Sequence, residues 1–326
     1  MFEVSYVATF YNKAEFVADV VGSILDQQGI GTAEIILVDD GSTDDTVERL
    51  AIAAASASDV KIIQTENKGP SSAINTGIFA ASGRYVKFLD GDDVLRPGAT
   101  RALIDALEDH DAVCAYGDII GAPADQRLAK MADLDPRFDK GVKFTDGLQR
   151  LVRDWQINPS MLLARGETLK QSGGADTRVF IQDYAAALRL THLGPIVRLE
   201  SPVAVFPEAV ETRLTANEAQ VLHDLNLATA LFLADVPDLP RGLRKAFVNR
   251  IWERAWKWAS RNGGQGLGSR VFRKRTMTRM GLGGFDTINM LEACLPFAET
   301  HPIRLTDQGK TLFDAAGLSH SGLVYS

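Results

Sequence analysis

Several features that mark particular protein classes are scarce in this 326-residue sequence. It has two cysteines, Cys114 and Cys294, and neither has a nearby cysteine or histidine at metal-ligand spacing. We therefore expect two buried thiols rather than a disulfide, in a reducing compartment. No run of about 18 apolar residues occurs, so we expect no membrane-spanning helix. No secretion signal precedes the first apolar run, and we expect a cytoplasmic protein.

The composition excludes a disordered chain, because 45% of the residues are hydrophobic and 24% are charged, as in ordinary globular proteins. The formal net charge of −7 argues against a nucleic-acid partner. This average hides an uneven distribution. The segment Arg241–Met280 holds twelve basic residues and one acid, so it carries +11 and the rest of the chain carries −18.

The first 120 residues alternate apolar runs with stretches of helical spacing. The runs that predict strands are Val4 to Ala8, Glu34 to Val38, Val60 to Gln64, Tyr85 to Leu89 and Ala112 to Tyr116. Phe16, Val20 and Ile24 share one face of a predicted helix, and a second predicted helix follows an N-cap at Ser42 or Thr43. This order predicts an α/β fold with a mainly parallel twisted sheet flanked by helices.

Polar side chains follow three of these strands, at the edge where parallel sheets bind ligands. They are Thr9, Tyr11 and Asn12, then Asp39 and Asp40, then Asp90, Asp92 and Asp93. So many carboxylates at one edge repel one another unless a cation compensates them. Oxygen ligands suit Mg²⁺ or Mn²⁺, which use one or two carboxylates together with phosphates and water. Each motif alone also fits a turn or a helix cap.

Four segments of the chain carry a resemblance to a known family. They are YVATFYNKAEFV, EIILVDDGSTDDT, NKGPSSAINTGIFAASGRYVKFLDGDD and GGADTRVFIQDYAAALRL. Through them, residues 1 to about 200 resemble the family 2 glycosyltransferases, inverting enzymes with the A-type nucleotide-sugar-binding fold and a Rossmann-like nucleotide half. The resemblance implies transfer of a sugar from a nucleoside-diphosphate sugar to a hydroxyl of a glycan or lipid-linked acceptor.

The resemblance also implies a nucleotide pocket. Thr9 and Tyr11 would lie against the base, and Asp40 would accept from a uracil ring nitrogen with Asp39 close by. A carboxylate that accepts from an imide N–H selects uracil or thymine over cytosine, because mismatched buried groups stay unpaired. The preferred donor is therefore a UDP-sugar, with a dTDP-sugar as the second choice.

Asp90-Gly91-Asp92 matches the family's Asp-x-Asp motif. By this resemblance Asp92 binds Mn²⁺ or Mg²⁺ bridging the diphosphate. Asp90 reaches the ribose or sugar and is the weaker candidate for the metal. The ion would neutralise charge on the departing nucleoside diphosphate.

The family's catalytic base is an acid near the start of a helix, about 90 residues beyond the metal motif. Here that position implies Asp183 as the base, and the alternative is that Asp183 only caps the helix. Gln182 stands where the family more commonly has Glu. Arg213 lies roughly where many relatives contact the diphosphate, so it is either such a contact or a solvated arginine. Asn158-Pro159-Ser160 is predicted as an acceptor-side loop.

We predict a catalytic domain over residues 1–235, with a nucleotide-binding half (1–120) and an acceptor half (121–235), followed by a basic, mostly helical region over residues 236–326. That region contains a basic amphipathic helix with Trp252, Trp256 and Trp258. The helix packs on the catalytic domain, docks a partner, or binds an anionic membrane through Arg241–Met280, and the last of these would place the protein at the inner face of the membrane. The last 42 residues predict a small helical subdomain or an oligomer contact.

Two other functions stay open at this point. A nucleotidyltransferase shares the sheet and the acids, but it usually has a glycine-rich basic loop after the first strand, and Ala8 to Asn12 is not such a loop. A non-catalytic nucleotide-sugar-binding protein is the other alternative. The presence of Asp90, Asp92 and Asp183 argues against it.

Overall fold

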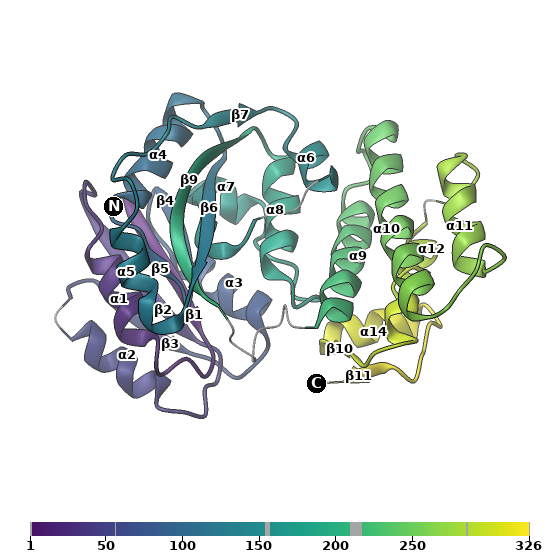
Figure 1. The fold of residues 1–326 in the computed structure, drawn as a ribbon, viewed down its shortest axis with the longest axis horizontal. Coiled ribbons are helices and arrows are strands. Elements are labelled where there is room, and N and C mark those ends of the chain that lie inside the picture. Colours follow the sequence, from purple (N-terminus) through teal and green to yellow (C-terminus); the bar gives the residue numbers. More distant parts are fainter. Residues whose placement is uncertain (1, 56, 154–156, 209–216, 285, 326) are drawn as a thin grey trace. The chain divides into compact units, whose positions relative to one another are not determined.

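The computed structural model describes residues 2–55, 57–153, 157–208, 217–284 and 286–325 (Figure 1). The chain forms two compact units, each built from segments that are separate in sequence. Unit 1 comprises Met1–Leu148, Gln156–Ala175 and Arg189–Val210, and unit 2 comprises Gln149–Trp155, Asp176–Leu188 and Glu211–Ser326. Unit 2 thus includes the segment with Asp183 as well as the predicted C-terminal region. The domain boundary at residue 235 stays a prediction.

Unit 1 is built on one mixed sheet, in which strands run in the order β3-β2-β1-β4-β8-β6-β9-β5 and β7 pairs with β9. The strands are β1 (Val4–Phe10), β2 (Ala33–Asp39), β3 (Val60–Gln64), β4 (Tyr85–Asp90), β5 (Val94–Leu95), β6 (Cys114–Ala122), β7 (Val142–Phe144), β8 (Leu162–Arg165) and β9 (Ile196–Pro207). The first four are parallel to their neighbours among themselves, as the sequence predicts. Antiparallel partners β5, β7 and β8 make the sheet mixed.

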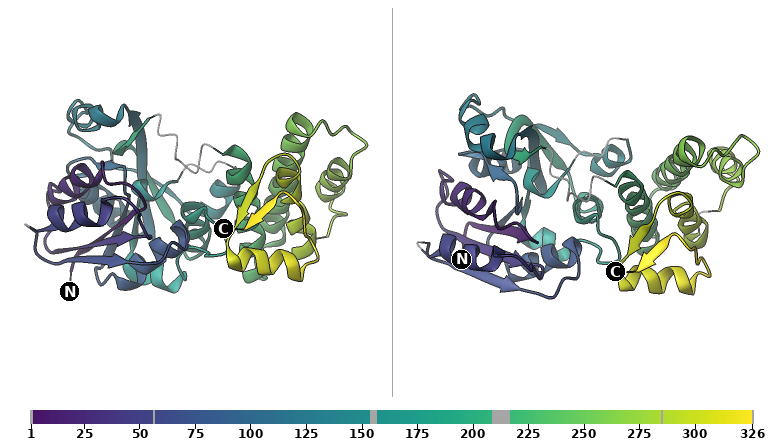
Figure 2. Two further views of the ribbon diagram at one scale, coloured as in Figure 1. Left: turned by 90° about the horizontal axis from the view of Figure 1, so that it is seen from below. Right: turned by 60° about the horizontal axis from the view of Figure 1, so that its bottom comes forward.

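Helices connect these strands (Figures 1 and 2). They are α1 (Val17–Leu25), α2 (Thr46–Ala54), α3 (Pro70–Ala80), α4 (Ala99–Asp109), η1 (Ala124–Gln126), α5 (Arg127–Ala132), α6 (Gly147–Arg153), η2 (Pro159–Met161), α7 (Gly166–Gln171) and α8 (Gln182–His192). α1 buries Val17, Val20, Val21 and Ile24 in the main core, so its periodicity was a reliable signal. The boundary between the two units falls within α6 and within α8.

The predicted N-cap of α2 is wrong. The helix begins at Thr46, and neither Ser42 nor Thr43 caps it. Ser42 Oγ instead accepts from the backbone N–H of Asn12 at 2.8 Å, and Asp44 accepts from the backbone N–H of Thr46 at 3.0 Å. These side chains stabilise the loop before the helix, which is the competing use of Ser and Asp near a helix start.

Both faces of β1 are covered. Val4, Tyr6 and Phe10 belong to the core that includes α1 and α4, while Val7 points the other way, toward α3. There a Cβ on Gly77 would lie 2.2 Å from Val7 Cγ1, so only glycine lets α3 approach the sheet this closely. A strand buried on both faces is typical of a sheet between two helical layers.

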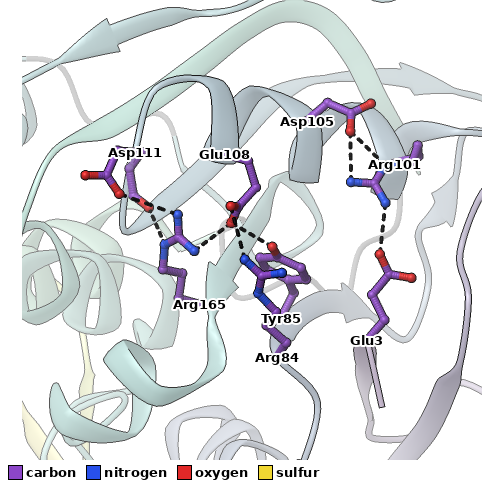
Figure 3. Close-up of polar contacts among 9 residues, drawn as sticks. Glu3, Arg84, Tyr85, Arg101, Asp105, Glu108, Asp111 and Arg165 are labelled. Atoms are coloured by element: carbon purple, nitrogen blue, oxygen red, sulfur yellow. Dashed lines mark hydrogen bonds and ion pairs between the residues drawn. The ribbon is translucent and has the colours of Figure 1, made fainter. Parts of the chain in front are cut away.

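Ion pairs stabilise the amino end of β4 (Figure 3). Glu108, at the end of α4, accepts from the Tyr85 hydroxyl and from Arg165 at 2.6 Å each, and it pairs with Arg84 at 3.1 Å. Near the start of α4, Arg101 pairs with Glu3 at 2.9 Å. The contacts connect α4 to β4, β8 and the residue before β1. They leave the opposite, carboxyl edge of the sheet to other residues.

Unit 2 contains a helical bundle with one small strand pair. Its elements after residue 216 are α9 (Glu218–Asp235), α10 (Arg241–Asn262), α11 (Arg270–Arg279), α12 (Thr287–Glu292), α13 (Leu295–Ala298), β10 (Ile303–Leu305), α14 (Asp307–Ala315) and β11 (Leu323–Tyr325). The mostly helical prediction is confirmed. The parallel pair β10–β11, drawn as yellow arrows in Figure 2, was not predicted, because each strand has only three residues.

The aromatic stripe of α10 is packed inside unit 2. Trp252 and Trp258 are 2% and 6% exposed, and Trp258 Nε1 donates to Thr300 Oγ1 at 2.8 Å. The ring of Trp256 lies 4.9 Å from that of Phe272 on α11. These tryptophans therefore pack against other elements of unit 2.

Both cysteines are free and buried, as predicted. Burial raises the pKa of the Cys114 thiol to about 12. Among the helices of the described ranges, none combines the length and hydropathy needed to cross a membrane.

Candidate active site

The carboxyl ends of β1, β2 and β4 meet at one edge of the unit 1 sheet. In the strand register Thr9 lies opposite Asp90 on β4, and Phe10 lies opposite Asp39 on β2. Asp40 and Asp92 follow directly in the two adjoining loops. The sheet therefore gathers the predicted nucleotide and metal residues at one edge, as the strand order implied.

The loops after β1 and β2 hold each other in place. Asn12, with a left-handed φ of 51°, accepts from the backbone N–H of Thr43 through Oδ1 at 2.8 Å. Asp39 Oδ2 accepts from the backbone N–H of Ser42 at 3.0 Å. Tyr11, which directly precedes Asn12 in the chain, is 46% exposed. A ring held on a fixed loop and open to solvent is suited to contact a flat ligand.

The two acids after β2 lie in different environments, although both are less than 5% exposed. Asp40 Oδ1 accepts from the backbone N–H of Lys68 at 3.1 Å, yet burial raises the pKa of this carboxyl more than its hydrogen bonds lower it. Asp39 Oδ1 is buried and has no hydrogen-bond partner within the described residues. Such an oxygen is uncommon in proteins and is usually completed by a ligand, ion or water.

The loop Asp90-Gly91-Asp92 packs tightly against β1. A Cβ on Gly91 would lie 2.6 Å from the backbone oxygen of Thr9, so no other residue fits here without moving the strand. Asp92 is 5% exposed and Asp93 is fully buried. The close approach fixes the position of both acids relative to Thr9.

Two basic residues that sequence reasoning missed lie beside Asp92. Lys13 Nζ pairs with Asp92 Oδ2 at 2.7 Å. Arg127, 1% exposed, donates to the backbone oxygen of Asp92 and pairs with Asp19 at 2.9 Å. Nothing local in the sequence indicates these contacts, because Lys13 and Arg127 are far from Asp92 along the chain.

A third missed residue, Lys87, lies beneath the acidic loop. Its ammonium group is buried on β4 and donates to the backbone oxygens of Phe88 at 2.8 Å and Ser160 at 2.6 Å. Burial lowers the pKa of Lys87 to about 7, although the charges of Asp93 and Asp90 oppose this. Ser160 Oγ in turn accepts from the backbone N–H of Asp90 at 2.9 Å. The sequence signal for Lys87 is a single lysine within the otherwise apolar interior of strand β4.

Asn158-Pro159-Ser160, predicted as an acceptor-side loop, begins the short helix η2. Asn158 caps η2 by accepting from the backbone N–H of Met161. Through Ser160 this segment contacts the carboxyl end of β4. The observed contact is thus with the acidic loop, and its acceptor role stays a prediction.

The residues at this edge fit a hard divalent ion. Asp90 and Asp92 offer carboxylate oxygens, and Mg²⁺ or Mn²⁺ needs only one or two of these when phosphates and water complete the shell. Within the described ranges no group of three or more His, Cys, Asp and Glu side chains is arranged to hold a metal by itself. The donor set therefore suits an ion shared with a phosphate ligand better than a closed protein site.

Asp183 lies in the first turn of α8, within the part of that helix that belongs to unit 2. The residue is partly exposed, and burial raises the pKa of its carboxyl to about 7. Oδ1 accepts from the backbone N–H of Tyr184 at 2.6 Å, which limits that rise. Arg213, the predicted diphosphate contact, lies outside the described residues.

Comparison with known proteins finds a family match in the first half of the chain. The glycosyl transferase family 2 model matches residues 5–161. The succinoglycan biosynthesis protein ExoO of Rhizobium meliloti is 35% identical over 130 residues, which cover 40% of this chain and 36% of that protein. Glycosyltransferase GlyG of Streptococcus pneumoniae is 34% identical over 116 residues, covering 35% and 38%. The match thus spans little more than a third of these relatives.

Solved structures show the same fold over most of the chain. TarS 1-349 of S. aureus superposes with a TM-score of 0.60 at 17% identity, covering 90% of this chain and 81% of that one. Mannosyltransferase PcManGT of Pyrobaculum calidifontis, in complex with GDP-Man and Mn²⁺, gives 0.51 at 17% identity, covering 91% and 86%. At these identities the likeness concerns the fold alone. The family match itself rests on residues 5–161, a little under half of the chain.

Proposed function

We propose that this protein is an inverting glycosyltransferase that moves a sugar from a nucleoside-diphosphate sugar to a hydroxyl of a glycan or lipid-linked acceptor. The observation that carries the proposal is the meeting of Thr9, Asp39 and Asp90 at one sheet edge within the family 2 domain. One fold neighbour, TarS, is described in complex with UDP-GlcNAc (TM-score 0.56, 14% identity). A UDP-sugar is our preferred donor and a dTDP-sugar the second choice.

In the donor pocket we assign the base to the surface between Thr9 and Tyr11, with Asp40 accepting from the ring N–H and Asp39 beside it. Tyr11 has the exposed ring that such stacking needs. The unsatisfied Asp39 Oδ1 offers an acceptor for a donor group of the nucleotide. Arg213 is our proposed diphosphate contact.

We assign the divalent ion, Mn²⁺ or Mg²⁺, to Asp92, with Asp90 directed to the ribose or sugar. When bound, the ion supplies Lewis-acid assistance to departure of the nucleoside diphosphate. The chain's own part is to fix the two carboxylates. Gly91 allows the close packing on Thr9, and Ser160 holds the backbone N–H of Asp90.

Asp183 is the proposed base that takes the proton from the acceptor hydroxyl as it attacks the anomeric carbon. A carboxyl whose pKa is raised to about 7 is well matched to proton transfer near neutral pH. Only the deprotonated form accepts a proton, so the rate should rise with pH through about 7 and then level off. Asp183→Asn should lower kcat by about a thousandfold and leave donor binding unchanged. Full transfer activity in this variant would contradict the assignment.

The basic segment Arg241–Met280 is our proposed contact with an anionic membrane or acceptor. Part of its charge serves the fold, since Arg244 donates to the last turn of α9 and Arg275 pairs with Glu253 at 2.6 Å. On α11, Arg273 is exposed beside Met277 and Met280, which are 46% and 67% exposed. Basic and apolar side chains together favour an anionic lipid surface. Binding to anionic vesicles should therefore weaken in Arg273→Gln, and equal binding to neutral vesicles would contradict it.

Donor binding is the direct test of the proposal. A thermal-shift screen of nucleotide sugars with Mn²⁺ should find a UDP-sugar that raises the unfolding temperature, because a ligand stabilises the folded state by mass action. The same sugar should then release nucleoside diphosphate, rather than pyrophosphate, when an acceptor is added. The absence of any shift, or release of pyrophosphate, would overturn the proposal.

A further inference from the structure

The segment of residues 176–184, which carries Asp183, is anchored on helix α9. Arg178 pairs with Asp235 at 2.9 Å, and the backbone N–H of Phe180 donates to Asp224 Oδ2 at 3.1 Å. The Tyr184 hydroxyl and Thr229 Oγ1 lie 3.1 Å apart. These three contacts fall along one helix and on both sides of Asp183. Contacts with α9 therefore fix the position of the residues at the start of α8.

Asp224 is the most constrained of the three α9 residues. It is 2% exposed, and its Oδ1 accepts from Gln220 Nε2 at 3.0 Å and lies 2.8 Å from His223 Nδ1. We place the His223 ring proton on Nδ1, since the carboxylate is an acceptor. Both neighbours hold Oδ1, which leaves Oδ2 directed at Phe180. A carboxylate fixed by side-chain donors has little freedom to follow a moving loop.

Gln220 extends this arrangement to the C-terminal strand pair. Its side-chain amide donates to the backbone oxygen of Arg304 at 3.1 Å and accepts from the backbone N–H of Arg304 at 2.8 Å, as a neighbouring strand would. The Arg304 guanidinium lies 5.1 Å from the centre of the Phe180 ring. Arg304 is thus connected to Phe180 in two ways: directly through its guanidinium group, and indirectly through Gln220 and Asp224.

We propose that Asp224 is a positioning residue for Asp183: by holding the backbone N–H of Phe180, three residues earlier, it sets where α8 begins and how the Asp183 carboxyl is presented. The inference rests on the proposed role of Asp183 as the base. It gives helix α9 a function in the reaction, namely the support of one acid.

The first test needs no substitution. In the full-length wild-type chain, the Phe180 amide should exchange with deuterium as slowly as the amides in the middle of α9, because both open only when the helix opens. Exchange of Phe180 at the rate of an exposed loop would overturn the inference.

The second test uses the near-isosteric Asp224→Asn, with Asn289→Ala as the matched control. Asn289 is buried in unit 2, and its hydrogen bonds are to Lys274 at 2.8 Å, Asp286 at 2.8 Å and Gly284 at 2.5 Å, all of them outside residues 176–184. We expect at least about tenfold faster exchange of Phe180 in Asp224→Asn only. An equal increase in both variants would show general loosening and contradict the inference.

Kinetics separate this inference from the proposed function. UDP release from UDP-N-acetylglucosamine, or from whichever nucleotide sugar the thermal-shift screen selects, should show a kcat lowered about tenfold or more in Asp224→Asn with the donor KM unchanged. If Asp183→Asn loses activity while Asp224→Asn keeps full kcat, Asp224 is not a positioning residue and the base stands. If Asp183→Asn keeps full activity, the base assignment fails, and the exchange data alone then report whether Asp224 holds the segment.

Discussion

The two edges of the unit 1 sheet carry acids in opposite electrostatic situations. At the amino edge, buried Glu34 accepts from Ser5 Oγ at 2.7 Å and Ser82 Oγ at 2.6 Å, and pairs with Lys61 at 2.8 Å. At the carboxyl edge, buried Asp39 keeps an oxygen without a donor in the described structure, and burial raises the pKa of Asp40. Acids at the first edge are satisfied by the protein. The acids at the second edge include Asp39, which keeps an oxygen that no described residue satisfies, as the proposed binding of a ligand requires.

The pKa values express this difference. Burial alone would raise the pKa of Glu34, but hydrogen bonds from Lys61, Ser82 and Ser5 outweigh it and bring the pKa to about 2. For Asp40 burial prevails over the backbone and hydroxyl donors. Acids at one end of a sheet can thus stabilise the fold, while acids at the other end are left less stable in a way that suits the proposed binding role.

The largest effect is expected at the carboxyl edge. Asp92→Asn should lower kcat/KM by about a thousandfold, on the order of 4 kcal/mol, because it removes the proposed metal ligand. Its free energy of unfolding should change much less, by about 1 to 2 kcal/mol, because the amide oxygen of an asparagine can still accept from Lys13 Nζ. Steady-state kinetics and urea unfolding measure the two quantities. A variant that unfolds easily yet turns over normally would reverse the comparison.

Glu34→Gln should have the opposite effect: it should lower the free energy of unfolding and leave the activity unchanged. The shift of the Glu34 pKa from 4.5 to about 2 corresponds to a stabilisation on the order of 3 kcal/mol near neutral pH. Because the folded-state pKa is lowered, this contribution is full above about pH 4.5 and is lost as the pH falls toward about 2. Urea unfolding across this pH range should show it, with donor binding unchanged. The exposed Glu66→Gln is the control, and an equal loss there would refute the prediction.

Lys13→Gln should sharpen the comparison from the side of the cation. The ammonium group of Lys13 pairs with Asp92 Oδ2, so its removal frees a proposed metal ligand. We expect Mn²⁺ to bind the ligand-free protein about tenfold more tightly, measured from the electron paramagnetic resonance signal of free Mn²⁺. Lys61→Gln, which removes a lysine from the amino edge, should leave Mn²⁺ binding unchanged. Weaker Mn²⁺ binding in Lys13→Gln would mean that Lys13 supports the metal site.

The smallest effect is expected at the ion pairs of Figure 3. Glu108→Gln should cost about 1 kcal/mol or less, because the Glu108 side chain is 38% exposed and solvent screens its pairs with Arg84 and Arg165. The difference from wild type should shrink further in about 1 M salt. A loss that is independent of salt would point to packing rather than charge.

Much of the fold and of this edge follows from local sequence. Alternating strands and helices in the first 120 residues predict the parallel strands, and polar residues directly after β1, β2 and β4 must then share an edge. What could not be predicted depends on distant contacts. Lys13 reaches Asp92 across 79 positions, and Ser160 reaches Asp90 across 70. Neither distance leaves a periodic signal.

The misjudged positions have the same origin. Ser42 and Thr43 looked like helix-capping residues because their types fit, but capping competes with the loop contacts that both residues make with Asn12 in the folded protein. The pattern of apolar and basic residues correctly predicted an amphipathic helix at α10. Whether the tryptophans face protein or lipid is decided by α11 and by Thr300, which the pattern of one helix does not contain.

The two buried thiols divide between the units, with Cys114 on β6 in unit 1 and Cys294 before α13 in unit 2. A thiol reagent can reach each sulfur only when its own unit opens. Alkylation followed by mass spectrometry of the two peptides would thus time the opening of each unit separately, in the native sequence and without an added label. The two native thiols therefore report separately on the unfolding of the unit 1 sheet and of the helical unit 2.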